Sequence, residues 1–274
     1  MALDLEISLS VAMVIYNEEK HLTECLESLE AISSDIVIIH DGVCTDKSKD
    51  IADAFGAKFY ERPRIGMCEG HRIDSFTLTK GEWILVMDAD ERLSTKLRNS
   101  IPALIKDYRY DAYEFIWPLY DGKKVISDSW PFKRALFRKE KMKYLDFPHA
   151  EFTTSGVLKR ENLILEHKPS YNNYTIRRFI KKWIPWAKIQ AVETLKDFNK
   201  LPKVGYHEND SWSKNFLFKR KFPELFLFYG FYYFFSNVKS GGYKNFHAFK
   251  SSVMWGLYNA CVYYFVMIEK CKKK

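Results

Sequence analysis

The sequence lacks the features of small cross-linked or fibrous proteins. Only five of its 274 residues are cysteine, they are widely spaced and none forms a CxxC pair. This argues against a disulfide framework or a zinc knuckle and for a reducing compartment. Twelve glycines and nine prolines exclude a collagen-like or low-complexity chain. The first ten residues carry acidic groups and no long apolar run, so we expect no signal peptide.

The hydrophobic content, 47%, is sufficient for a sizeable core in one large domain or two modest ones. Charge is unevenly distributed along the chain. Residues 1–130 contain 15 Lys and Arg against 24 Asp and Glu, whereas residues 131–274 contain 28 against 11. An acidic half can hold phosphate through a metal ion, and a basic half suits phosphate-bearing lipid, a membrane surface or nucleic acid.

Short apolar runs alternate with amphipathic stretches over the first 106 residues. This pattern predicts βαβ units and a mostly parallel sheet. Ligands of such sheets bind at the carboxyl ends of the strands, where this chain places most of its polar motifs. The expected strands are 8–16, 35–41, 57–62 and 82–90, and the expected helices are 21–30, 47–55, 67–79 and a segment from Ser94 to Lys106.

The pattern changes after residue 112. Residues 112–170 predict a small mixed sheet beside the first, and residues 171–274 are helical, basic and aromatic. We therefore expect two domains, 1–170 and 171–274. Pro185 should kink the helix predicted over 174–195. The uncharged run 251–268 favours helices lying in a membrane interface, ahead of an aromatic cap packed on the catalytic domain or a true membrane span.

Asp88 and Asp90 directly follow the fourth predicted strand and form a DxD pattern. Two carboxylates at i and i+2 on a turn can converge on one hard cation such as Mg²⁺ or Mn²⁺, which is commonly shared with substrate phosphates. The alternative is that these residues merely favour the turn or cap the next helix.

Four motifs occur together with spacing that supports the metal interpretation. Together they resemble the family-two glycosyltransferases of GT-A fold, and most closely the subset that builds lipopolysaccharide core and related surface glycans. The resemblance covers about residues 8–170. Its motifs are Tyr16-Asn17-Glu18-Glu19, His40-Asp41-Gly42-Val43-Cys44-Thr45-Asp46, Gly66-Met67-Cys68-Glu69-Gly70-His71-Arg72 and Met87-Asp88-Ala89-Asp90-Glu91-Arg92.

The resemblance implies a role for each matching residue on the donor side. The sequence departs from the family at Gly42-Val43-Cys44, which replaces the usual order and its Ser. The implied roles are as follows: Tyr16, Asn17 and Glu18 border the nucleotide, Asp41 accepts a hydrogen bond from the base, Arg72 faces the diphosphate or braces the carboxylates, Asp88 contacts ribose or metal, and Asp90 binds the metal.

On the acceptor side, the family's His-Glu pair corresponds to His149 and Glu151, with Glu151 displaced by one residue. Sugar transfer, the reaction implied by the resemblance, needs a base near the acceptor hydroxyl. The Glu151 carboxylate can serve as this base. His149 is expected to complete the metal shell or contact phosphate, or else to be a structural histidine. His167 is a further metal candidate. Trp130, Arg134 and Arg138 either contact acceptor phosphate or hold strands.

The implied activity is metal-dependent, inverting sugar transfer from a nucleotide-sugar donor to a glycolipid or lipid-linked glycan. The expected cofactor is Mg²⁺ or Mn²⁺, and the expected donor is a UDP-sugar because UDP is common in the family. The basic, aromatic region would place the protein peripherally on the inner face of the cytoplasmic membrane, at an anionic surface.

Three alternatives stay open at this stage. A nucleotidyltransferase would need a glycine-rich phosphate loop near the N-terminus, but no glycine precedes Gly42. A nucleic-acid-binding protein would use the basic tail, yet the Lys and Arg there are interleaved with long apolar stretches. We therefore expect no nucleic-acid partner. The third alternative is a non-catalytic membrane scaffold.

Overall fold

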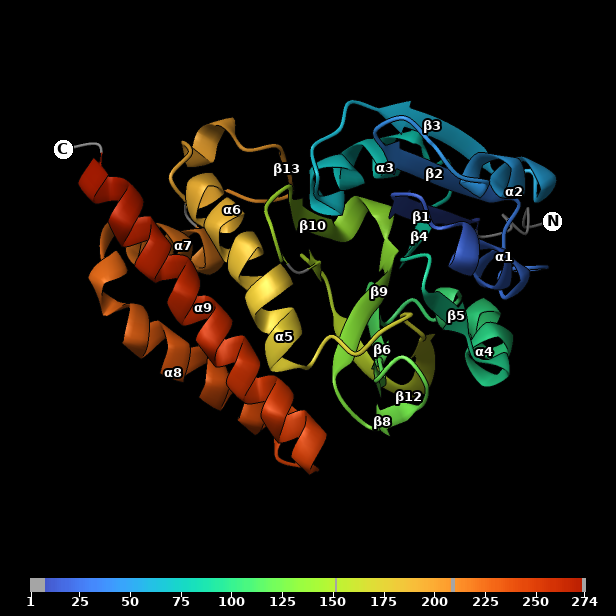
Figure 1. Cartoon of the computed structure of the whole chain (residues 1–274). Coiled ribbons are helices and arrows are strands. Elements are labelled where there is room, and N and C mark those ends of the chain that lie inside the picture. The colour runs from blue at the N-terminus through green and yellow to red at the C-terminus, as the bar shows by residue number, and fades with distance from the viewer. Residues whose placement is uncertain (1–7, 151, 208–209, 273–274) are drawn as a thin grey trace. The chain divides into compact units, whose positions relative to one another are not determined.

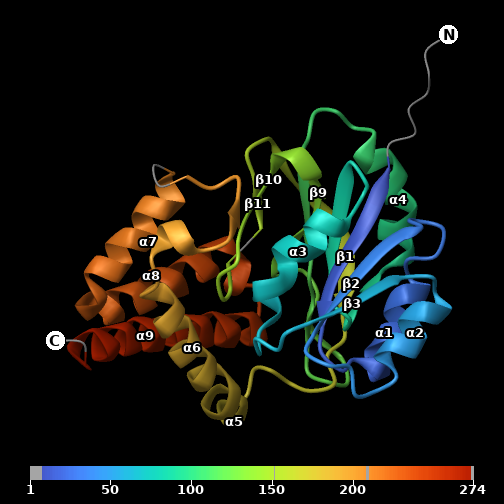
Figure 2. The same cartoon turned by 90° about the horizontal axis from the view of Figure 1, so that it is seen from above.

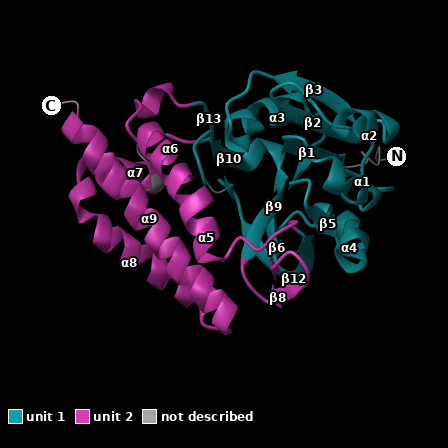
Figure 3. Ribbon diagram, viewed as in Figure 1, with its two compact units in different colours: residues 1–117, 132–168, 202–205 teal, residues 118–131, 169–201, 206–274 magenta. Residues whose placement is uncertain are grey.

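The computed structural model describes residues 8–150, 152–207 and 210–272. The chain forms two compact units (Figure 3). Unit 1 comprises residues 1–117, 132–168 and 202–205, and unit 2 comprises residues 118–131, 169–201 and 206–274. The second unit thus takes in a short hairpin from the middle of the chain as well as the helical C-terminal region.

Unit 1 is built on an eight-stranded sheet in the order β3-β2-β1-β4-β9-β6-β12-β5 (Figure 1). The first four strands are parallel, β12 is parallel to β6, and β9 and β5 are antiparallel to their neighbours. The strands are β1 (Leu9–Ile15), β2 (Asp35–Asp41), β3 (Lys58–Arg62), β4 (Trp83–Met87), β5 (Glu91–Leu93), β6 (Ala112–Ile116), β9 (Phe132–Arg138) and β12 (Leu158–His167).

Helices cover both faces of this sheet, which confirms the predicted α/β fold class of GT-A type (Figure 2). Side chains of β1 alternate between the faces, so Val11 and Met13 pack on one side and Ala12 on the other. The helices of the Val11 side are α1 (Glu19–Glu27), α2 (Ser48–Ala54) and α4 (Thr95–Ile105), and the other side carries α3 (Arg72–Leu78).

The elements predicted over residues 8–106 are confirmed within a few residues at their ends. Ser94 accepts a hydrogen bond from the backbone of Leu97 and so begins α4, as its sequence position indicates. Part of the stretch expected to be helical from residue 67 is a 3-10 turn over Cys68–His71.

The smaller sheet differs from the one predicted. Three of the segments expected in it, β6, β9 and β12, instead extend the large sheet, because their apolar side chains Tyr113, Phe115, Leu136 and Leu165 continue its core. The separate sheet contains β10 (Met142–Leu145), β11 (Thr153–Thr154) and β13 (Lys203–Val204), all antiparallel.

Unit 2 is helical apart from the hairpin of β7 (Leu119–Tyr120) and β8 (Val125–Ser127). Pro185 cannot donate a backbone hydrogen bond, and the helix widens into a π-helical segment over Phe179–Trp183 just before it. The helices are α5 (Ile176–Arg178), α6 (Ile184–Thr194), α7 (Ser211–Lys221), α8 (Phe226–Asn237) and α9 (Phe246–Lys272). None of the helices described has the length and apolar character needed to cross a bilayer.

Candidate active site

The polar motifs at the carboxyl ends of β1 and β2 are joined to each other by hydrogen bonds. Asn17, in the left-handed region at φ +50°, donates through its amide to Thr45 at 2.7 Å and accepts from the Thr45 backbone at 3.1 Å. The backbone of Glu18 donates to Ser48 at 2.8 Å. Tyr16 is exposed, and the guanidinium of Arg64 lies 3.2 Å from its ring centroid. The turn therefore presents an aromatic ring and a guanidinium at the sheet edge.

Asp41 is buried and its carboxylate holds the loop that follows β3. Its two oxygens accept from the backbones of Ile65 at 2.6 Å and Gly66 at 2.9 Å, and His71 lies 3.1 Å away. The Asp41 side chain is 2% exposed. Its contacts organise the loop containing Arg64, while the contact to a nucleotide base predicted for it remains a prediction.

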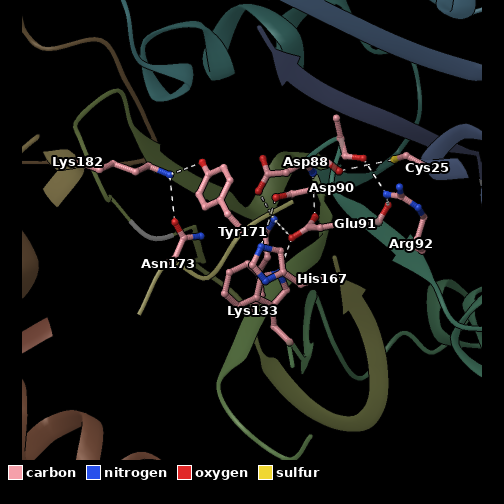
Figure 4. A network of polar contacts seen from close by, with 12 residues as sticks. Cys25, Asp88, Asp90, Glu91, Arg92, Lys133, His167, Tyr171, Asn173 and Lys182 are labelled. Carbon is pink, nitrogen blue, oxygen red and sulfur yellow. Dashed lines mark hydrogen bonds and ion pairs between the residues drawn. The ribbon is translucent and has the colours of Figure 1, made fainter. Parts of the chain in front are cut away.

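The turn after β4 contains a network of ion pairs and hydrogen bonds (Figure 4). Asp88 lies between two cations: Arg72 donates to its Oδ1 at 2.7 Å and Lys133 of β9 to its Oδ2 at 2.7 Å. Burial alone would raise the pKa of Asp88, but the charges of Lys133 and Arg72 outweigh burial and hold it well below its usual value. Asp88 is therefore ionised, and both its oxygens are paired.

Glu91 stabilises the same turn through hydrogen bonds. It is fully buried, and burial raises the pKa of its carboxyl above the usual range. Its Oε1 accepts from Lys133 and from the indole of Trp117, each at 2.5 Å, and its Oε2 accepts from the Asp88 backbone at 2.8 Å. Glu91 thus fixes the turn backbone, Lys133 and Trp117 together.

Asp90 points to a different partner. Its Oδ2 lies 3.4 Å from Nε2 of His167, at the end of β12, and the His167 ring stacks on Trp117 with centroids 3.6 Å apart. Burial raises the pKa of Asp90, but the hydrogen bond and charge of His167 outweigh it, so the pKa lies below its ordinary value. Nδ1 of His167 is buried without a hydrogen-bond partner. The Asp90 side chain is 28% exposed, so a ligand can reach this carboxylate.

The structure does not gather every predicted metal ligand. Across the described ranges, no three His, Cys, Asp or Glu side chains are grouped so as to hold a metal, so Asp88, Asp90 and His149 do not form such a group. His149, at φ +56°, donates its backbone N–H to Glu69 at 3.4 Å. Glu151, the predicted base, lies outside the described residues.

Arg134 and Arg138, which follow Trp130 in the sequence, form ion pairs with residues in or next to neighbouring strands. Arg138 pairs with Glu82 and lies 3.4 Å from Asp111, and Arg134 lies 3.6 Å from Glu114. Lys133 and Trp117 belong to the network at the turn after β4, although no sequence motif points to them. Their only sequence signal is their position in strand-like segments after residue 112, because their partners lie 26 to 45 residues away.

Asp146 was also assigned no role, although it begins the motif containing His149. Burial raises the pKa of its carboxyl to about 7, and its Oδ1 is buried without a hydrogen-bond partner. It is therefore the side chain of unit 1 whose charge changes nearest neutral pH among those with a shifted pKa.

A mostly parallel sheet covered on both faces, with acidic and aromatic turns at its strand ends, is typical of nucleotide-binding α/β proteins. The chain belongs to glycosyl transferase family 2, whose family model matches residues 10–163. This match confirms the predicted family. Membership of the lipopolysaccharide-core subset stays a prediction.

Relatives in several Rickettsia species are described as uncharacterized glycosyltransferases. The Rickettsia bellii protein is 30% identical over 105 residues, which are 38% of this chain and 35% of that protein. The match therefore spans about a third of that relative's length. The Rickettsia felis protein is 25% identical over 240 residues, covering 81% of this chain and 82% of the relative.

The solved structures similar to this chain include two proteins of low sequence identity. Residues 1–349 of Staphylococcus aureus TarS give a TM-score of 0.46 at 14% identity, covering 97% of this chain and 91% of that one. Glucosyl-3-phosphoglycerate synthase from Mycobacterium tuberculosis, in complex with Mn²⁺ and UDP, gives 0.44 at 13% identity, covering 73% and 87%.

Proposed function

We propose that this chain transfers a sugar, with inversion, from a nucleotide-sugar donor to a lipid-linked or surface-glycan acceptor. The observation that carries the proposal is the turn 88–91, where Asp88 is held between Arg72 and Lys133 while Asp90 stays available beside His167. Membership of glycosyl transferase family 2 supports sugar transfer as the chemistry.

The donor set suits a divalent cation that is shared with a diphosphate. Asp90 is anionic, and the Nε2 of His167 faces it, so these two side chains would hold Mg²⁺ or Mn²⁺ together with phosphate oxygens. Such an ion supplies Lewis-acid stabilisation of the departing nucleoside diphosphate. Both oxygens of Asp88 are paired, so we assign it to orienting Arg72 and Lys133 rather than to direct metal binding.

The chain's own residues would perform the remaining steps. Tyr16, Asn17 and Glu18 border the nucleotide at the end of β1, where the exposed Tyr16 ring and the Arg64 guanidinium stacked on it form a contact surface. Arg72 and Lys133 place two positive charges beside the turn, where they counter the charge of a leaving diphosphate. Asp41 acts through the loop 64–66 that it holds. Glu151 remains the proposed base, with His149 beside it in the sequence.

The identities of the donor and of the acceptor are a second, more specific part of the proposal. We propose a UDP-sugar donor and an acceptor of lipopolysaccharide type, made at the inner face of the cytoplasmic membrane. The support for a membrane-borne acceptor is the composition of residues 131–274, in which Lys and Arg greatly outnumber Asp and Glu and aromatic residues are frequent.

The test is a thermal-shift screen of nucleoside diphosphates and nucleotide sugars, with and without Mn²⁺. One nucleotide should raise the melting temperature only with metal, and Asp90→Asn should abolish this rise. Asp107→Asn, which changes a partly exposed aspartate paired with Arg109, is the matched control and should behave as wild type. An equal rise in wild type and Asp90→Asn would overturn the site assignment.

A further inference from the structure

Helix α8 carries a continuous exposed apolar stripe. Its members recur at i, i+1, i+4, i+5 and i+8, so they lie on one side of the helix. No charged residue occurs from Leu225 to Val238. The side chains of the stripe, each between 49% and 64% exposed, are Leu227, Phe228, Phe231, Tyr232 and Phe235.

The stripe cannot turn inward, because the opposite side of α8 is fixed against α9. Tyr229 and Gly230 are buried there. A Cβ atom on Gly230 would come within 2.9 Å of Ala260, and one on Gly256 within 2.8 Å of the Gly230 carbonyl oxygen. Two glycines thus allow the two backbones to approach closely, and this contact leaves the aromatic stripe of α8 facing outward.

Helix α9 has a matching stripe on its own outward side. Its exposed large apolar and aromatic residues recur at helical spacing and are Phe246, Phe249, Val253, Leu257 and Tyr264. A cavity of about 280 Å³ adjoins this stripe, lined by Ile176 and Phe179 together with Lys250, Val253, Met254 and Leu257 of α9. Its walls are apolar.

Exposing this much apolar surface to water is unfavourable. Fully burying a large apolar side chain is worth about 1.5–3 kcal/mol. The ten residues of the two stripes are between 36% and 73% exposed, so an apolar partner would gain part of this free energy at each of them. Contiguous exposed patches of this kind mark interaction surfaces.

The composition around the stripes favours a lipid bilayer as the partner. Residues 206–274 contain 11 Lys and Arg against 4 Asp and Glu, which favours an anionic surface. Phenylalanine and tyrosine on a helix flanked by basic residues suit the headgroup boundary. At 12 residues, α8 is about 18 Å long, well short of the roughly 30 Å hydrocarbon core.

We propose that the α8 and α9 stripes dock unit 2 onto an anionic bilayer, with α8 lying in the plane of the interface. This deepens the proposed function, since it names the surface by which the enzyme would reach a membrane-borne acceptor. Insertion of uncharged aromatic side chains, and not lysine charge alone, provides the binding. Part of the binding should therefore survive high salt.

The first test is flotation of the full chain with vesicles of phosphatidylcholine, with and without phosphatidylglycerol. Wild type should float with anionic vesicles and remain partly bound at about 1 M salt, where the Debye length is about 3 Å. Phe228→Ser combined with Phe231→Ser should lower the partition coefficient at least tenfold. Tyr108→Ser, which removes an exposed aromatic of unit 1, is the matched control. Equal flotation of all three proteins would overturn the proposal.

A fluorescence probe separates insertion from self-association. In Phe231→Trp, the added emission should shift to the blue on adding anionic vesicles and be quenched by brominated lipid. A blue shift that depends on protein concentration without vesicles would instead assign the stripe to a second copy of the chain. Nucleotide-dependent thermal stabilisation should be unchanged in these variants, so failure of docking is distinguishable from failure of the proposed function.

Discussion

The indole of Trp117 stacks on the imidazole of His167 at 3.6 Å and 19°, and its N–H donates to Glu91 at 2.5 Å. Through this pair, the residue that anchors the DxD turn also sets the ring facing Asp90. The two carboxylates of the motif are thus positioned by one buried group, Asp88 through Lys133 and Asp90 through Trp117 and His167.

Trp117→Phe should retain a stacked ring and lose the indole donor. We expect a stability loss of about 1–3 kcal/mol, because a buried carboxylate loses a hydrogen bond, and a fall in kcat for sugar transfer larger than any change in KM. Steady-state kinetics and denaturant unfolding measure both quantities. Tyr113→Phe, which removes a hydrogen bond to the Leu104 carbonyl, is the control. If both variants lose transfer equally, the Trp117 link has no specific role.

Lys133→Met should leave Asp88 and Glu91 without their shared cation. Removing one partner from a buried ion pair costs about 3–5 kcal/mol, measurable by denaturant unfolding. Adding Glu91→Gln should recover part of this loss, since one of the two stranded charges is then removed. Additive losses in the double variant would show that the two residues act independently.

Asp146 should make stability depend on pH. Its folded pKa of about 7 lies above the ordinary 3.8, so the stabilisation it contributes is complete below pH 4 and is lost as pH rises to 7. Asp146→Asn should therefore raise the free energy of unfolding above pH 7 by roughly 4 kcal/mol at most, and so raise the melting temperature. This gain should shrink toward pH 4. A melting-temperature series across pH measures this. Asp107→Asn should show no such gain, and a pH-independent difference for Asp146→Asn would contradict the assignment.

Lys219, in unit 2, should make stability depend on pH in the opposite direction, so that stability rises with pH. Burial lowers the pKa of its ammonium to about 8 from 10.5, while its Nζ donates to the Tyr233 hydroxyl at 2.8 Å. The unfolded chain holds this proton more tightly, so stability rises with pH between 8 and 10.5. Lys219→Met should stabilise by about 3 kcal/mol at pH 7, and the gain should fade toward pH 10. The control is Lys214→Met, on an exposed position of α7, and a gain that persists at pH 10 would refute the burial argument.

Local periodicity was sufficient to predict the first half of unit 1. The continuous β-branched run 35–41 and the helical spacing of Leu22, Cys25, Leu26 and Leu29 each describe a single element buried by its neighbours. The polar turns at the carboxyl ends of β1, β2 and β4 follow from that order. The position of Asp88 and Asp90 in an acidic turn after β4 was therefore predictable from the sequence.

What the sequence by itself determined is the strand and helix order up to residue 106 and the acidic turn after β4, because those signals lie within a few neighbouring residues. Only the tertiary structure decided that β6, β9 and β12 extend the large sheet, that Lys133 and Trp117 meet Glu91, and that His167 faces Asp90. These contacts join segments 26 to 77 residues apart, and they depend on strand order and packing, which a local pattern of side chains does not encode.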